Sequence, residues 1–157
     1  MIKFSNLWES IFQILLAAIG SAGFAIALNA KKTRILAGGI GGGISWGIYI
    51  LCEYLSLNEF SASLFSAIFV YIYSAVLSKT QKAPINVFFA PTVIPLLPGG
   101  GLYYTIYALM ENNRSEFYAF GKETLQISLG LVIGFVLSSV VWNFFASPPS
   151  PKQQKNA

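Results

Sequence analysis

Hydrophobic stretches long enough to cross a bilayer divide this 157-residue chain, and no other feature limits its fold as strongly. A crossing of the hydrocarbon core needs about 20 mostly apolar residues. Five stretches meet that length, at residues 10–28, 35–55, 61–77, 85–110 and 124–145. Only 10% of the residues are charged, against about 25% in a soluble domain. The sequence therefore predicts an all-α, polytopic membrane protein with a transmembrane domain over residues 1–146.

The two ends of the chain need separate interpretation. Residues 147–157, SPPSPKQQKNA, are polar and contain three prolines, so we expect a disordered cytoplasmic tail. The tripeptide AIA at 25–27 resembles the cleavage site of a signal peptide. A signal peptide carries positive charge before its apolar core, whereas here the basic cluster at 31–34 follows that core. We therefore expect the first stretch to be retained as a crossing.

The basic residues between the crossings predict an orientation. Lys and Arg are enriched in cytoplasmic connections. One side of the predicted bilayer holds three basic residues, and the other side holds Lys31, Lys32, Arg34, Lys79, Lys82, Lys152 and Lys155. In the cell (inner) membrane, this places the amino terminus outside and the carboxyl terminus in the cytoplasm. The assignment requires the fourth stretch to cross once, because a re-entrant hairpin would move the terminal lysines to the outer side.

The residue types exclude several classes of function. The chain has no His, and each of its charged residues lies at or beyond the end of a predicted crossing. No serine–histidine or paired-carboxylate arrangement suggests nucleophilic chemistry, so we expect no catalytic residue, no metal site and no cofactor. The basic residues form no continuous face, which argues against nucleic acid as a partner. An integral membrane enzyme is thus a weak alternative, and the lone Cys52 is interpreted as inert packing.

The fourth stretch contains the motif PTVIPLLPGGGLYY at 91–104, which concentrates helix-breaking residues in apolar sequence. A proline lacks an N–H group and clashes with the carbonyl four residues earlier. We therefore predict a broken helix, with bare carbonyls near Pro91 and Ile94 and a second half starting near Gly100. The amino end of such a half-helix offers N–H donors to a carboxylate; the alternative is a simple proline kink. The predicted solute-binding residues are Pro95, Pro98, Gly99, Gly100, Gly101, Tyr103 and Asn29, with helix capping as the alternative for Asn29.

Glycines four residues apart recur in the second and fifth stretches. Such pairs lie on one helix face and allow a neighbouring backbone to come close. We predict helix packing at Gly38, Gly42, Gly43, Gly47, Gly130 and Gly134. A sliding interface or a pore lining is the alternative for the same residues.

Two motifs give the chain a family resemblance. GFAIALN at 23–29 and PTVIPLLPGG at 91–100 resemble the threonine/serine exporter family, in particular its small, YjjB-like subunit. The resemblance implies an inner-membrane exporter in which a larger membrane subunit supplies the other half of the transporter. Threonine, serine and succinate-like dicarboxylates are the solutes it implies. Pro95, Pro98, Gly99 and Asn29 match the family pattern, and the polar, His-containing motifs of the larger half have no counterpart here.

Two functions of different classes follow from these observations. The chain is predicted to be a subunit that exports small carboxylate-bearing metabolites, with solute contacts at the broken helix and the lipid bilayer around it. Alternatively, it is a structural or assembly subunit that contributes no solute contact.

Overall fold

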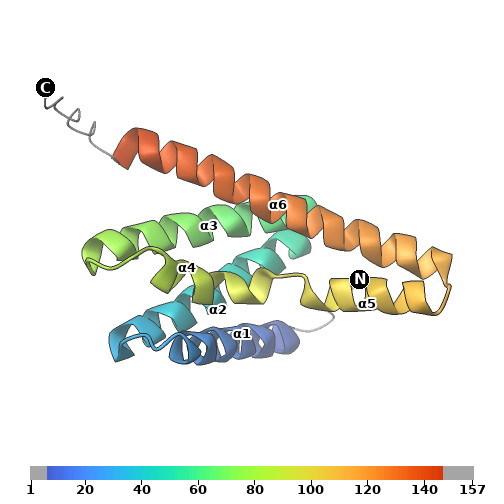
Figure 1. Ribbon diagram of the computed structural model, residues 1–157, viewed down its shortest axis with the longest axis horizontal. Helices are drawn as coiled ribbons and strands as arrows, with labels where there is room; N and C mark the ends of the chain where they lie inside the picture. The colour runs from blue at the N-terminus through green and yellow to red at the C-terminus, as the bar shows by residue number, and fades with distance from the viewer. Residues whose placement is uncertain (1–6, 147–157) are drawn as a thin grey trace, which may run out of the picture.

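Seven helical segments make up the part of the chain that the computed structural model describes, residues 7–146 (Figure 1). No strand occurs within this range. The segments are α1 (Leu7–Ala27), α2 (Lys32–Tyr54), α3 (Glu59–Thr80), α4 (Asn86–Val93), the short 3-10 helix η1 (Ile94–Leu96), α5 (Gly99–Met110) and α6 (Arg114–Ala146). The tail predicted at 147–157 lies outside the described residues.

Four of these helices, α1, α2, α3 and α6, are long and apolar enough to cross a membrane. The segment α4–η1 and α5 make a fifth crossing if the bent pair is one span, since its two parts are inclined at 49°. The prediction of an all-α, multi-pass membrane protein with a helix broken at the Pro/Gly motif is thereby confirmed. The exact limits of each span in the bilayer stay a prediction.

Helix α2 lies at the centre of the bundle. It packs along α1 on one side and against α3 and α4 on others, while α6 packs along α3 and α5 (Figure 1). Tight turns make these helices antiparallel neighbours. Each turn has one residue with positive φ, and these residues are Asn29, Ser56, Lys82 and Asn112. The N–H group after each of them donates to the carbonyl five residues earlier, as Ala30 does to Ala25 at 3.1 Å, which is the bond that ends many helices.

Small side chains fill the interior of the bundle. The fully buried residues include three alanines, five serines and Thr92, whereas Phe88 and Val70 are the largest apolar side chains among them. Large apolar residues such as Ile19 and Leu36 face outward and are each 67% exposed. Lipid is as apolar as these side chains, so helices in a bilayer associate through close packing of small residues. The arrangement fits a protein surrounded by lipid.

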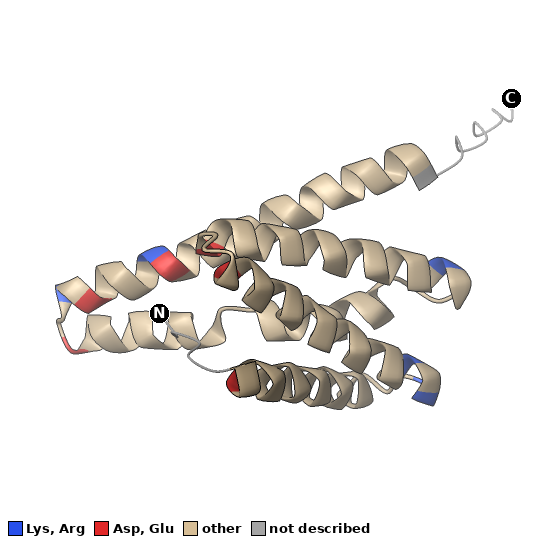
Figure 2. Cartoon of the chain, turned by 180° about the vertical axis from the view of Figure 1, so that it is seen from behind, with Lys and Arg blue, Asp and Glu red and all other residues tan. Residues whose placement is uncertain are grey.

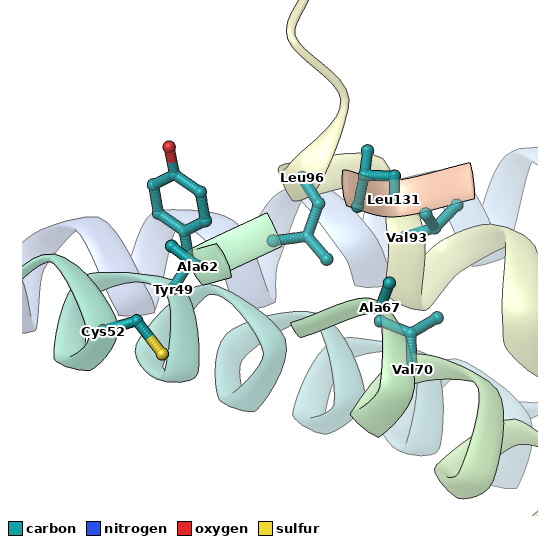
Figure 3. Close-up of a cluster of buried hydrophobic side chains, with 8 residues drawn as sticks. All are labelled: Tyr49, Cys52, Ala62, Ala67, Val70, Val93, Leu96 and Leu131. Carbon is teal, nitrogen blue, oxygen red and sulfur yellow. The ribbon is translucent and has the colours of Figure 1, made fainter. Parts of the chain in front are cut away.

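One cluster of buried side chains joins the broken helix to the rest of the bundle (Figure 3). Its members come from α2, α3, α4, η1 and α6, and they are Tyr49, Cys52, Ala62, Ala67, Val70, Val93, Leu96 and Leu131. Val93 and Leu96 immediately precede the break, so the cluster fixes the chain on that side of it. Cys52 is a free, buried thiol, in agreement with a packing role.

Helix α6 is longer than a bilayer requires. Its 33 residues span about 50 Å at about 1.5 Å per residue, against about 30 Å of hydrocarbon. It begins at Arg114, ten residues before the apolar stretch 124–145, and Asn113 Oδ1 accepts the N–H of Glu116 at 3.4 Å at that end. The extra turns pair with α5. Residues 99–123, here called the α5–α6 hairpin, extend past the ends of the other helices (Figure 1).

Charged residues mark the two ends of the bundle (Figure 2). The basic end carries Lys and Arg around the turns that follow α1 and α3. The acidic end carries Glu53 and Glu59 around the α2–α3 turn. At the basic end, the Nζ atom of Lys79 lies 4.9 Å from the ring centre of Trp142, which ties α3 to α6 by a cation–π contact.

Candidate functional site

The break between η1 and α5 consists of Leu97 and Pro98. Leu97 is extended, with φ −67° and ψ 128°, and Pro98 precedes α5 with φ −77° and ψ 55°. Two further prolines prepare the break, since Pro91 lies inside α4 and Pro95 begins η1. Each proline removes one N–H donor from the helical ladder. The chain therefore changes from an α-helix to a 3-10 turn and then leaves helical geometry.

Most backbone groups at the break have hydrogen-bond partners, but the N–H groups of Gly100 and Gly101 have no acceptor in the helical ladder. Leu97 N–H donates to the Ile94 carbonyl at 3.3 Å, so the prediction of a bare carbonyl at Ile94 is wrong: the 3-10 turn uses it. Gly99 N–H donates to the Leu97 carbonyl at 2.7 Å, and Leu102 N–H makes the first bond of α5, to Pro98, at 3.0 Å. Gly100 and Gly101 occupy the first turn, where a helix offers no acceptor. Their N–H groups lie at the positive end of the α5 dipole.

The start of α5 is open on one side and closed on the other. Gly99 and Gly100 are exposed, and a Cβ added at either would meet no described atom within 4 Å. A Cβ at Gly101 would instead lie 2.5 Å from Thr124 Oγ1 of α6. That hydroxyl oxygen is buried and has no hydrogen-bond partner among the described residues. Thr124 therefore closes one side of this helix end, and Gly99 and Gly100 lie at its open side.

Three glutamates lie near this end of the bundle, and Lys122 adjoins one of them in the sequence. Glu53, Glu59 and Glu123 are close enough to interact electrostatically, and Glu123 directly precedes Thr124. The Tyr49 hydroxyl donates a hydrogen bond to the Glu59 carboxylate. Among the described residues, no group of three or more acidic or cysteine side chains is arranged to hold a metal ion.

Side-chain hydrogen bonds hold α4 against α2 just before the break. The buried Ser45 hydroxyl donates to the Thr92 carbonyl at 3.0 Å, and Thr92 Oγ1 donates to the Phe88 carbonyl at 2.7 Å. Close approach is possible because Gly41 lacks a side chain: a Cβ there would lie 2.6 Å from Thr92 Oγ1 and 2.5 Å from Tyr73 Cε1. The α4 segment is therefore held closely against α2 and α3.

A groove of about 430 Å³ runs beside the break, between α1, α2 and η1. We call it the α1–η1 groove. Its polar lining comes from Gln13 and Ser21 of α1 and from the indole of Trp46 of α2, whose Nε1–H donates to Gln13 Oε1 at 3.4 Å. Ile94 and Pro95 form the η1 wall. A second hollow of about 250 Å³ lies between α3, α4 and α6 and includes Asn86. The α4–η1 segment therefore has a hollow on each of two sides.

The structure distributes the predicted solute-binding residues over three places. Pro95 lines the α1–η1 groove, while Pro98 and the three glycines lie at the start of α5. Tyr103 is 63% exposed on α5 and contacts the rings of Tyr104 and Tyr107. Asn29 lies in the turn that ends α1, away from both places. The structure thus brings Pro98 and the glycines together and leaves Asn29 and Tyr103 apart from the groove.

The predicted packing glycines lie where helices approach each other. A Cβ at Gly42 would come within 1.8 Å of Ser21 Oγ, and one at Gly43 within 3.1 Å of the Ala18 Cβ. At the α3–α6 interface, a Cβ would lie 2.5 Å from the Phe60 carbonyl at Gly130 and 2.6 Å from the Ala67 Cβ at Gly134. A Cβ at Gly38 would lie as close, 3.0 Å from the Pro91 Cβ, whereas one at Gly47 would make an ordinary contact of 3.5 Å with Ile14. These distances agree with packing, which stays a prediction until the glycines are changed.

Comparison with known families adds the decisive observation. A family model described as "Threonine/Serine exporter, ThrE" matches residues 13–141, which include the bundle and the break. The chain belongs to the threonine/serine exporter family. The resemblance seen in GFAIALN and PTVIPLLPGG is thereby confirmed. No solved structure matches this exporter chain.

Sequence reasoning missed the polar residues of the groove in this exporter chain. Gln13 and Ser21 lie in an apolar stretch, and nothing in their spacing connects them to Pro95, which is more than 70 positions later. The one available signal was the presence of Gln13, because an amide within a membrane helix requires a polar partner.

Proposed function

We propose that this chain is the small subunit of a two-chain exporter that moves small carboxylate-bearing metabolites out of the cell across the inner membrane. The observation that carries the proposal is the open start of α5, where Gly100 and Gly101 present N–H groups at a break in an apolar helix. Membership of an exporter family supports a transport role for such a break. Broken helices form solute sites in several transporter folds.

The charges around the break favour an amino-acid zwitterion such as threonine or serine over a C4-dicarboxylate such as succinate. One carboxylate suits the N–H groups and the dipole of α5. A second carboxylate would approach Glu53, Glu59 and Glu123 at the same end of the bundle, whereas an ammonium group is attracted by them. The proposed solute therefore carries both charges.

A larger membrane subunit is proposed as the partner. If the bent pair is one span, the chain has an odd number of crossings, and many transporters combine two paired halves. The described residues place no acidic side chain in the middle of a crossing, so a group that would couple export to protons is expected on the partner or in the solute. The α5–α6 hairpin also exposes large apolar side chains, including Leu102, Ile106 and Met110.

The proposed orientation places the basic end in the cytoplasm and the acidic end outside. Basic residues gather at the turns after α1 and α3 (Figure 2), which is the pattern of cytoplasmic connections.

The proposal is tested by changing Gly99 or Gly100 to Val and expressing each variant with the larger subunit. Space at both positions accommodates the new side chain, so we expect an intact complex with reduced efflux of threonine and serine. Gly23→Val is a matched control, because its Cβ also meets no described atom within 4 Å but lies on α1. Full efflux by the Gly99 and Gly100 variants would remove the solute site from this helix end.

A structural or assembly role is the second candidate, and the exposed apolar side chains of the α5–α6 hairpin favour it. The same variants separate the two functions. A scaffold predicts that efflux falls only as far as the amount of assembled complex falls. Quantifying both in one membrane preparation decides between them.

A further inference from the structure

The hollow between α3, α4 and α6 is an apolar groove at the surface of the bundle, and we call it the α4–α6 groove. Its volume of about 250 Å³ is below the usual range of sites that enclose a whole small molecule. Phe89 of α4 and Phe135 of α6 line it and meet edge to face, with ring centres 4.9 Å apart. Val136 also lines it and is 55% exposed. The groove therefore opens on a surface that lipid or another membrane protein covers.

The groove runs toward the basic end of the bundle. Tyr71 is its lining residue on α3, and Lys79 follows eight residues later, about 12 Å along the helix at about 1.5 Å per residue. Ser139 lines it on α6, and Trp142 follows by about one helical turn. The Nζ atom of Lys79 lies 4.9 Å from the ring centre of Trp142. An ammonium group is thus held just beyond the end of the groove.

A second lysine adjoins the same end of the groove from α4. Ile85 and Asn86 line the groove at the start of this helix. Lys82 is exposed in the turn just before them. Among the described residues, only basic charges lie at this end of the bundle (Figure 2). An apolar groove and two ammonium groups therefore follow one another along the direction in which the helices cross the membrane.

This sequence of surfaces matches a phospholipid with an anionic headgroup. One leaflet contributes about 15 Å of hydrocarbon, half of the full thickness of about 30 Å. The path of about 12 Å from Tyr71 to Lys79 fits within that depth. Lysines near the membrane surface attract anionic lipid, and basic pockets between membrane helices bind such headgroups. A helix of another protein would need a carboxylate at this position to match the two lysines, whereas an anionic lipid brings its own phosphate.

We propose that the α4–α6 groove binds one anionic phospholipid. Part of an acyl chain lies along Phe89, Phe135 and Val136. The phosphate lies near Lys79 and Lys82. The inference depends neither on the transported solute nor on the orientation of the chain. Such a lipid joins α4, which precedes the break, to α6, against which α5 packs.

Native mass spectrometry tests the headgroup. The full-length chain, with any membrane subunit that co-purifies, is titrated in detergent with phosphatidylglycerol and separately with phosphatidylcholine. We expect the first phosphatidylglycerol to bind more tightly than phosphatidylcholine, and Lys82→Gln to weaken it about fivefold, the effect of one lysine near an anionic lipid. Lys32→Gln is the matched control, because Lys32 is also exposed at the basic end but belongs to α2, which does not line the groove.

A second pair of variants tests the acyl chain. Val136→Trp places an indole in the groove and leaves both lysines in place, so we expect loss of the tight phosphatidylglycerol site. Val132→Trp is the control, because Val132 lies about one turn earlier on α6 and is 57% exposed but does not line the groove. Thermal unfolding of both variants shows whether the fold is kept.

Several outcomes would overturn the inference. Equal affinities for the two lipids would exclude an anionic headgroup, and equal weakening by Lys82→Gln and Lys32→Gln would mean that only the total charge of this end attracts lipid. A tight site that survives Val136→Trp would lie elsewhere. A site present in the isolated chain but absent from its complex would mean that the partner covers the groove. Lipid binding is measured without flux, so a failure of the proposed export function would not alter this result.

Discussion

Two glycine clusters in this chain have opposite surroundings. In α2, a Cβ added at Gly41, Gly42 or Gly43 would lie between 1.8 and 3.1 Å from atoms of neighbouring helices. At the start of α5, a Cβ at Gly99 or Gly100 would meet no described atom within 4 Å. Neither cluster needs glycine for backbone conformation, because no described glycine has positive φ. The first cluster brings helices together, and the second leaves a helix end uncovered.

The difference shows that the spacing of glycines does not by itself distinguish a packing role from an open helix end. Small residues at a helix interface are selected by the distance to a neighbouring backbone. Small residues at a helix end that faces open space leave room for another molecule. The two clusters therefore predict different costs of substitution, and the following variants rank them.

Gly42→Val should have the largest effect on stability. The new Cβ would lie 1.8 Å from Ser21 Oγ and 2.5 Å from Ser21 Cβ, so α1 and α2 must separate. We expect a loss of about 3 kcal/mol in the free energy of unfolding, the upper part of the usual range for overpacking. Thermal unfolding of the purified protein in detergent measures it. Gly47→Ala serves as a control, because its Cβ makes an ordinary contact of 3.5 Å with Ile14; equal midpoints would contradict the packing role.

Gly130→Ala should come second. Its Cβ would lie 2.5 Å from the Phe60 carbonyl oxygen and 2.9 Å from the Ser63 Cβ, and a backbone oxygen cannot rotate away. We expect a loss of about 2 kcal/mol, within the range for overpacking, measured by the same unfolding assay. A variant as stable as the unmodified protein would show that α3 and α6 slide apart without cost.

Gly23→Ala should have a smaller effect of opposite sign. No described atom lies within 4 Å of the added Cβ, and alanine favours a helix interior over glycine by about 0.5–1 kcal/mol. The midpoint of thermal unfolding should therefore rise. A lower midpoint would reveal a contact on this face of α1 that depends on the partner or on lipid.

Gly100→Ala should change stability least. The position lies in the first turn of α5 with open space beside it, so we expect a change within about 0.5 kcal/mol, as for surface substitutions. Efflux by the complex should nevertheless fall, because the methyl group occupies the space proposed for the solute. Unchanged efflux together with unchanged stability would make the second cluster resemble an ordinary loop.

Length, hydropathy and proline positions were sufficient to predict the membrane helices and the break. These properties are local, since each crossing needs its own apolar length and each proline disrupts its own helix. They do not give the extent of a helix beyond its apolar stretch, where distant residues contribute. Helix α6 begins ten residues before the apolar stretch 124–145, where Asn113 caps it and Phe120 stacks on Tyr104 of α5.

The candidate site was predictable only in part, for the same physical reason. The break and the glycines at Gly99–Gly101 follow from the sequence around them. The α1–η1 groove needs Gln13 and Ser21 to meet Pro95, and that meeting depends on how α1, α2 and η1 pack. The bond from Gly99 N–H to Leu97 was also missed, since it depends on the conformation of Leu97 and not on residue type.

The two-residue break has a mechanical consequence. Val93 and Leu96 are embedded in the bundle, whereas α5 packs mainly on the projecting part of α6. The 12 residues of α5 form an arm of about 18 Å at about 1.5 Å per residue. A displacement of the far tip, near Met110, therefore changes mainly the torsion angles of Leu97 and Pro98. A partner that binds the tip can thus alter the geometry of the break.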